Sequence, residues 1–149
     1  MDMAFDKKSW HGTNLRGSLR NVDAATAAWR PQPDRHSIWE ITLHAAYWKY
    51  TVWRRLTNAP KSTFARQGSN WLTPPAEASA KAWELDVKLL GDTHRALRAA
   101  VCELDATDLP RKPESSKVAN FELLSGIIAH DLYHAGQIQL LKRLYRRLP

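Results

Sequence analysis

The segment His130-Asp131-Leu132-Tyr133-His134-Ala135-Gly136-Gln137-Ile138 carries two histidines four residues apart, inside a stretch with the periodicity of one long helix. A four-residue step on an α-helix places two side chains about 40° apart around the axis and about 6 Å apart along it. Both imidazoles can therefore reach a single metal ion, as the two histidines of an H-E-x-x-H motif do.

The same two histidines lie on the apolar stripe of this predicted helix, where leucine would be expected. The stripe consists of Leu123, Ile127, His130, His134, Ile138 and Leu141. A buried imidazole costs free energy unless its ring nitrogens have partners. The pair therefore indicates either a metal site or two core histidines whose partners are backbone carbonyls and other side chains.

Two helices are predicted in the first third of the chain. Residues 14–29 have apolar positions at helical spacing, and Thr13 is the predicted N-cap. Residues 37–56 begin with Ser37-Ile38-Trp39-Glu40, which has the S-x-x-E pattern of a capping box. The apolar stripe of this second helix also includes a histidine, His44.

Two more helices are predicted in the remainder. The third follows Pro74-Pro75 and continues to about Leu104, because proline is tolerated in the first turn of a helix. The fourth extends from a cap at Ser115, Ser116 or Asn120 to about Arg147. Residues 57–74 form a connector that is long for a helix bundle, and its length allows the second and third helices to run parallel.

Four amphipathic helices, with no stretch of strand-like alternation, predict an all-α four-helix bundle. We expect it to form one domain over residues 1–149. No apolar run reaches 18 residues and the N-terminus lacks a signal-peptide core, so we expect neither a membrane helix nor secretion. The single cysteine, Cys102, excludes an internal disulfide and fits a reducing cytoplasm; we expect it to be buried and unreactive.

The formal net charge of +7 raises the question of an anionic partner. The positive charges gather at predicted helix C-termini, as in Lys142, Arg143, Arg146 and Arg147, where they complement the helix dipole. No DNA-binding motif accompanies them. We therefore expect an anionic small-molecule substrate rather than nucleic acid.

Four of the six histidines, His44, His94, His130 and His134, fall on predicted core stripes of three different helices. Facing side chains in a bundle core are where such folds build metal sites. Three neutral imidazoles with one position left for water are typical of a catalytic metal rather than a structural one. Imidazole ligands suit Zn, Ni, Co or Fe rather than Mg or Ca.

Two segments of the chain resemble the DinB-like superfamily. They are Ser37-Ile38-Trp39-Glu40-x-x-x-His44 and the distant His130-Asp131-x-Tyr133-His134-Ala135-Gly136-Gln137-Ile138. Trp10-His11-Gly12, Leu15 and the lead from Pro31 to Ser37 are also similar, so the resemblance covers nearly the whole chain.

The resemblance implies a four-helix bundle of up-down-down-up topology. It also implies a divalent metal ion held by one histidine of the second helix and two of the fourth, and these positions correspond to His44, His130 and His134. Zn or Ni is the first expectation for the metal, with Fe, Co or Mn as alternatives. We also expect a homodimer.

Members of this superfamily include transferases and isomerases that use low-molecular-weight thiols such as bacillithiol, mycothiol or glutathione. The resemblance therefore implies a metal-dependent enzyme, and we expect a thiol-dependent S-transferase, because a metal ion stabilises the thiolate nucleophile. Two alternatives stay open: a metal-dependent hydrolase and a non-catalytic metal-binding protein associated with stress. No catalytic residue is assigned.

For most of the other candidate residues, the sequence allows two interpretations. His94 is a core histidine or a pocket residue, and His11 is a surface residue or lies at the pocket mouth. Asp131 orients a ligand histidine or pairs with a surface Lys or Arg. Gln137 lines the pocket or bonds a neighbouring helix. Trp71, in the connector, covers a site or anchors the loop to the core. His36 we expect to be solvated.

Overall fold

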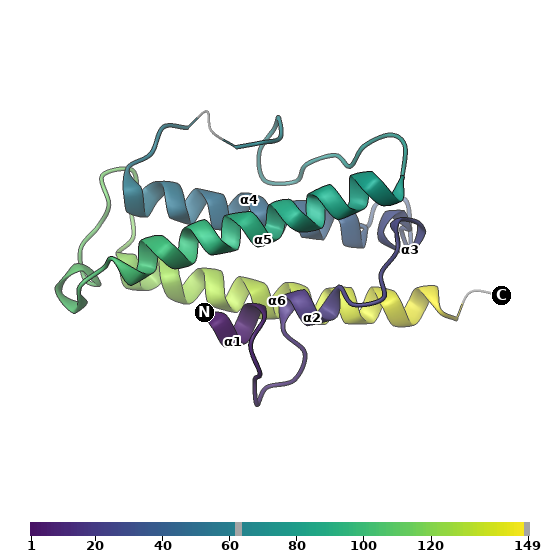
Figure 1. The fold of residues 1–149 in the computed structure, drawn as a ribbon, viewed down its shortest axis with the longest axis horizontal. Coiled ribbons are helices and arrows are strands. Elements are labelled where there is room, and N and C mark those ends of the chain that lie inside the picture. The colour runs from purple at the N-terminus through teal and green to yellow at the C-terminus, as the bar shows by residue number, and fades with distance from the viewer. Residues whose placement is uncertain (62–63, 148–149) are drawn as a thin grey trace.

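The computed structural model describes residues 1–61 and 64–147, and within these ranges it contains helices and no β-strand. Three helices are long: α4 (Ile38–Thr57), α5 (Ala80–Cys102) and α6 (Asn120–Tyr145). They extend side by side along the molecule, with α4 and α5 running in the same direction and α6 in the opposite one (Figure 1). The all-α class is confirmed.

Shorter helices complete the structure. They are α1 (Asp2–Phe5), α2 (Leu15–Ser18), α3 (Ala24–Ala28) and the 3-10 helix η1 (Ala106–Asp108). Helices α1 and α2 pack on α6, and α3 packs on α4 and α5. Between α4 and α5, residues 58–61 and 64–79 lie along the outside of the long helices (Figure 1).

The predicted first helix, residues 14–29, is wrong as a continuous element. Asn14, not Thr13, caps α2, and its Oδ1 accepts a hydrogen bond from the Gly17 N–H at 2.8 Å. Asn21 has a left-handed backbone (φ 57°), which stops helical propagation. The Asp23 carboxylate then caps α3 by accepting from the Thr26 N–H. Because the first segment is two short helices, the four-helix bundle topology stays a prediction.

Helix α4 begins with the predicted capping box. The Ser37 Oγ accepts from the Glu40 N–H at 3.2 Å, and the Glu40 carboxylate accepts from the Ser37 N–H at 2.8 Å. The helix ends at Asn58 in the left-handed conformation (φ 53°). Most of its circumference is buried, so α4 is the central helix of the molecule.

The other two long helices differ from prediction at their ends. Helix α5 begins at Ala80 with Ser79 as its cap, several residues after Pro74-Pro75. Helix α6 begins at Asn120, with Ala119 as the N-cap residue whose N–H donates to the Glu122 carboxylate at 3.1 Å. None of the helices in the described part of the chain has the length and hydrophobicity to cross a membrane.

Candidate metal centre

Three histidines meet between the central helix α4 and helix α6. His44 comes from α4, and His130 and His134 come from consecutive turns of α6. The Nε2 atom of His130 lies 3.0 Å from that of His44 and 3.1 Å from that of His134. Nitrogen ligands about 2.0–2.1 Å from a tetrahedral metal ion are about 3.3 Å apart. The three nitrogens therefore have nearly the spacing that one ion requires.

Two of the three rings are fixed by hydrogen bonds on their outer nitrogen. The Nδ1 atom of His44 donates to the Asn70 carbonyl oxygen at 3.0 Å, and that of His134 donates to Oε1 of Gln137 at 2.6 Å. Because both partners are acceptors, the proton of each neutral ring is on Nδ1. Each Nε2 then carries a lone pair that faces the centre.

The protein alone does not satisfy the hydrogen-bonding capacity of these ring nitrogens. The Nε2 of His130 lies between two lone pairs, and a neutral imidazole has one proton to offer at most. Its Nδ1 is buried and has no hydrogen-bond partner. A cation at the centre would bind all three lone pairs at once, so the residues present fit a metal ion.

Burial keeps these imidazoles uncharged. It lowers the pKa of His44 to about 4 and that of His130 to about 3, and it also lowers the pKa of His134 below its usual value. The proximity of the rings to one another adds to the effect for His44 and His130. All three rings are therefore in the neutral form that binds metal at neutral pH.

The connector between α4 and α5 covers one side of the site. The indole of Trp71 stacks on the His44 ring with centroids 3.8 Å apart, and the His36 ring stacks on Trp71 at 3.6 Å. Both pairs are nearly parallel, so Trp71 lies between the two imidazoles. Trp71 thus contacts the site, and His36, although its side chain is 43% exposed, is part of the cover rather than simply solvated.

Asp131 does not orient a histidine of the triad. Its Oδ2 accepts from Nζ of Lys49 at 2.6 Å, and both side chains are fully buried between α4 and α6. The prediction that it pairs with a cation is confirmed, but the pair lies in the core rather than on the surface. Lys49 is a residue that the sequence analysis missed, and its signal was a lysine within an otherwise apolar stretch of α4.

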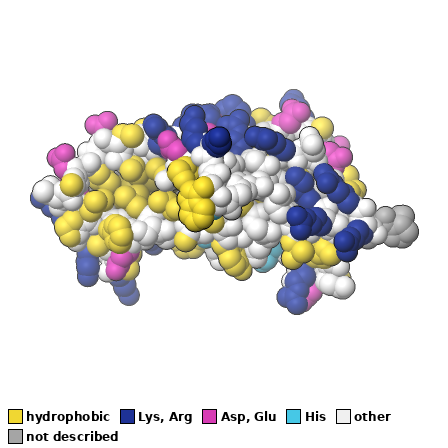
Figure 2. Space-filling model, turned by 90° about the horizontal axis from the view of Figure 1, so that it is seen from below, with side chains coloured by type: hydrophobic (Ala, Val, Ile, Leu, Met, Phe, Trp, Pro, Cys, Tyr) yellow, Lys and Arg dark blue, Asp and Glu magenta, His cyan; other side chains and the backbone are white. Residues whose placement is uncertain are grey.

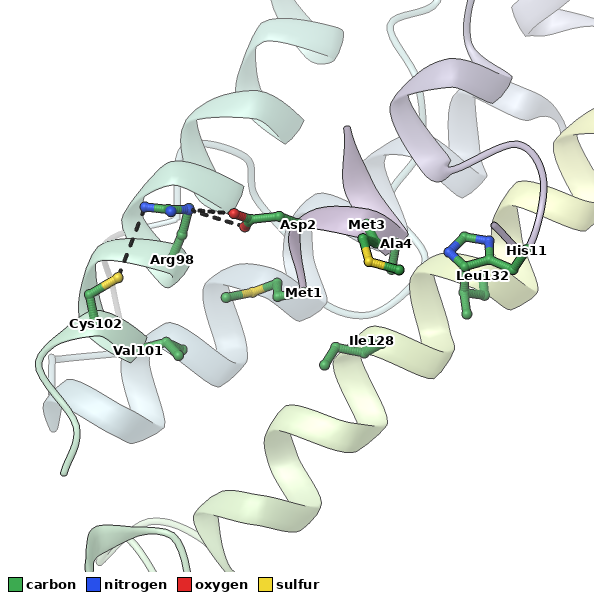
Figure 3. Close-up of a pocket in the computed structure, with 10 residues that line it drawn as sticks. All are labelled: Met1, Asp2, Met3, Ala4, His11, Arg98, Val101, Cys102, Ile128 and Leu132. Atoms are coloured by element: carbon green, nitrogen blue, oxygen red, sulfur yellow. Dashed lines mark hydrogen bonds and ion pairs between the residues drawn. The ribbon is translucent and has the colours of Figure 1, made fainter. Parts of the chain in front are cut away.

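The remaining candidates lie away from the triad. His94 is a core histidine that stacks on Phe5 at 3.6 Å. His11 lines a surface groove of about 560 Å³ beside Leu132 and Ile128 (Figure 3). These two α6 residues are each two positions from His130, about 200° around the helix, so the groove is on the opposite side of α6 from the triad. Cys102 is exposed at the rim of this groove, so its predicted burial is wrong.

Positive charge gathers on the face formed by α1, α2 and α6. Figure 2 shows Lys and Arg side chains toward one end of this face and hydrophobic side chains toward the other. Lys7, Lys8, Arg20 and Lys142 line one groove here. Lys142 has a structural role, since its Nζ donates to the carbonyl oxygens of Ser18, the last residue of α2, and of Arg20 just after it, at 2.9 and 2.6 Å.

A family model described as the DinB superfamily matches residues 9–138, a range that includes all three histidines. No curated protein and no solved structure matches the chain.

Proposed function

The chain belongs to the DinB superfamily, and on that premise we propose that it is a metal-dependent enzyme whose His44, His130 and His134 hold one divalent transition-metal ion. The observation that carries this proposal is the convergence of three Nε2 atoms, because the single proton that a neutral His130 can offer satisfies at most one of the two facing lone pairs. Zn and Ni fit three imidazole ligands best, and Fe, Co and Mn are the alternatives.

We propose thiol-dependent S-transfer as the reaction. A divalent ion bound by three neutral imidazoles keeps its full positive charge, which favours the thiolate form of a bound thiol near neutral pH. No Cys, Asp or Glu of the described residues joins the three histidines. The thiol is therefore supplied by a small cofactor. Its sulfur forms a bond to the substrate carbon as the leaving group departs, and the thiol proton passes to solvent.

The chain's own residues hold the ligands and shield the site. Gln137 orients His134, while Asn70 and Trp71 hold His44. The Tyr133 hydroxyl accepts from Nε2 of Gln137 at 3.1 Å, and the Tyr133 residue is 64% exposed, so its own proton is free to contact a substrate at the rim of the site. The indoles of Trp48 and Trp71 form apolar walls beside His44.

Metal-dependent hydrolysis is the second candidate. Three histidines with a position left for water are also the ligand set of hydrolytic zinc centres, in which the ion lowers the pKa of water. The two reactions differ in one requirement, because hydrolysis proceeds without a thiol.

Turnover by the zinc- and nickel-loaded protein, with and without low-molecular-weight thiols, tests the proposal. S-transfer requires turnover of an electrophilic substrate only when metal and thiol are both present, and loss of turnover in His134→Ala. His11→Ala, a histidine variant on the opposite side of α6, should keep it. Turnover without thiol would instead identify a hydrolase. No turnover from fully metal-loaded protein would favour a non-catalytic metal-binding role.

We further propose that residues 1–149 form a single domain, and that the protein is a cytoplasmic homodimer that takes an anionic small molecule rather than nucleic acid. Sedimentation equilibrium measures the mass directly, and a monomer at micromolar concentration would contradict the dimer. Retardation of DNA at low salt would contradict the choice of a small molecule.

A further inference from the structure

We infer that the connector between α4 and α5 is a working part of the metal centre, with Asn70 and Trp71 as positioning residues that set the metal affinity of His44. The inference rests on the proposed metal site and deepens it. It gives an irregular segment the role of orienting a proposed metal ligand, in addition to the three histidines themselves.

Asn70 joins the connector to two successive turns of α4. Its carbonyl oxygen accepts from Nδ1 of His44, and its side-chain Oδ1 accepts from Nε1 of Trp48, both at 3.0 Å. The backbone of Asn70 is left-handed (φ 59°), a conformation that Asn adopts far more readily than most residues. This conformation presents the carbonyl and the side chain of one residue to His44 and Trp48 together.

Trp71 fixes the plane of the same imidazole. Its indole is 10° from parallel with the His44 ring, and the His36 ring is 7° from parallel on the other face of the indole. The hydrogen bond to Asn70 restrains rotation of the His44 ring, and the stack restrains its tilt. With both in place, Nε2 of His44 is directed at His130 before any metal arrives.

The connector is anchored to the core on both sides of Asn70. On one side, Nε of Arg66 donates to Oδ1 of Asp86 on α5 at 3.0 Å, and Oδ2 of this carboxylate also accepts from the Trp39 indole of α4. On the other side, Leu72 is buried in the main hydrophobic core. These contacts hold Asn70 and Trp71 against His44 without help from a ligand. Preorganisation of this kind raises affinity because less motion is lost on binding.

Cobalt binding by variants of the full chain tests the inference, because the visible spectrum of Co²⁺ reports ligand geometry as well as affinity. Trp71→Ala should weaken Co²⁺ binding about tenfold, the lower end of the range for residues that orient metal ligands, and should change the spectrum. Trp71→Phe, which keeps an aromatic face, should restore most of the Co²⁺ affinity and most of the wild-type spectrum. Trp10→Ala is the matched control, since Trp10 is 89% exposed and makes no contact with the triad.

Two variants of Asn70 distinguish the role of its backbone from the role of its side chain. Asn70→Gly tolerates the left-handed backbone and loses only the bond to Trp48, so Co²⁺ affinity should change by less than about threefold. Asn70→Val disfavours that backbone, because a β-branched residue is strained at positive φ, and should weaken binding about tenfold. In the unsubstituted protein, Zn²⁺ should slow hydrogen exchange of the amides at residues 64–79.

Wild-type affinity and spectrum in both Trp71→Ala and Asn70→Val would overturn the inference while leaving the three-histidine site intact. Failure of the wild-type protein to bind Co²⁺ would instead overturn the proposed function itself. Should Trp71→Ala not fold, as judged by circular dichroism, the Asn70 pair and the exchange measurement decide. Unchanged exchange at residues 64–79 together with equal affinities for the Asn70 variants would count against the inference.

Discussion

Gln137 selects which nitrogen of His134 faces the centre. Its Oε1 lies 2.6 Å from Nδ1 and accepts the ring proton, which leaves Nε2 free to bind metal. Gln137→Leu removes the acceptor, and we expect zinc affinity to fall by about tenfold to a hundredfold. Gln137→Glu keeps an acceptor oxygen and should bind at least as well as wild type. Competition with a chelating dye measures both, and equal affinities for wild type and Gln137→Leu would contradict the role.

His94 makes the stability of the metal-free protein depend on pH. Burial, with the nearby charge of Lys49 as a lesser cause, lowers the pKa of His94 from 6.5 to about 3. The unfolded chain therefore binds a proton at this site between these two pH values and the native protein does not. The free energy of unfolding consequently falls as the pH drops below 6.5 and levels off near pH 3.

We expect His94→Leu to reduce this sensitivity. Between pH 7.5 and pH 5 the variant should lose about 2 kcal/mol less than wild type, the effect of one proton taken up only by the unfolded chain. Urea unfolding in the presence of a chelator gives the comparison. Parallel losses in wild type and His94→Leu would show that His94 becomes protonated as readily in the native state.

The sequence predicted that His44, His130 and His134 come together, and it predicted less of their surroundings. The four-residue spacing of His130 and His134 on an apolar stripe indicates that they act together. His44 follows from the resemblance of its helix to a known family. Asn70 contacts His44 across 26 positions of an irregular connector. The sequence singled out Trp71 of this segment as a candidate cover, and Trp71 does stack on the His44 ring. No periodicity runs through the segment, so nothing in the sequence indicates that the carbonyl of Asn70 meets the ring.

At the level of elements, the Lys49–Asp131 pair joins α4 to α6 beside the three histidines. Both charges are fully buried, and burial lowers the pKa of Lys49 while the carboxylate opposes the shift. Lys49→Met leaves the Asp131 charge without a partner, and we expect a loss of about 3–5 kcal/mol in the free energy of unfolding. Urea denaturation with chelator present measures this loss.

The double variant Lys49→Met, Asp131→Leu provides the control for that prediction. With both charges removed and similar volume retained, stability should return to within about 1–2 kcal/mol of wild type, because buried pairs contribute little net stability relative to apolar residues. The single variant Asp131→Leu completes the comparison. If the loss of stability in the double variant equals the sum of the losses in the two single variants, the two side chains act independently.

The long helices were predictable because their apolar stripes and, for α4, the capping box agree with one another. The first segment failed for a local reason. Leu15, Leu19 and Val22 are buried as a continuous helix would bury them, yet Asn21 adopts a left-handed backbone and Asp23 caps a new helix, in which Ala24 and Ala27 are the buried residues. Periodicity reports which residues face the core, and two short helices can satisfy it as well as one.

For the whole molecule, the proposed metal ligands His44 and His130 connect parts of the chain that are 86 residues apart. An ion that binds only the native arrangement should therefore stabilise the entire fold. At a free zinc concentration 100 times the dissociation constant, the gain is about 2.7 kcal/mol. Thermal unfolding with and without zinc measures it, and His44→Ala should show no increase in its midpoint. A wild-type midpoint unaffected by zinc would argue against a site built from both helices.

Metal content per chain tests the central claim most directly. Elemental analysis of untagged protein, purified and then reconstituted with zinc or nickel, should give about one transition-metal ion per chain, as three imidazole ligands around one centre require. His134→Ala should lose the ion and His11→Ala should retain it. Wild-type protein that holds no metal after reconstitution, or a His134→Ala variant that holds as much as wild type, would contradict the assignment of His44, His130 and His134 as its ligands.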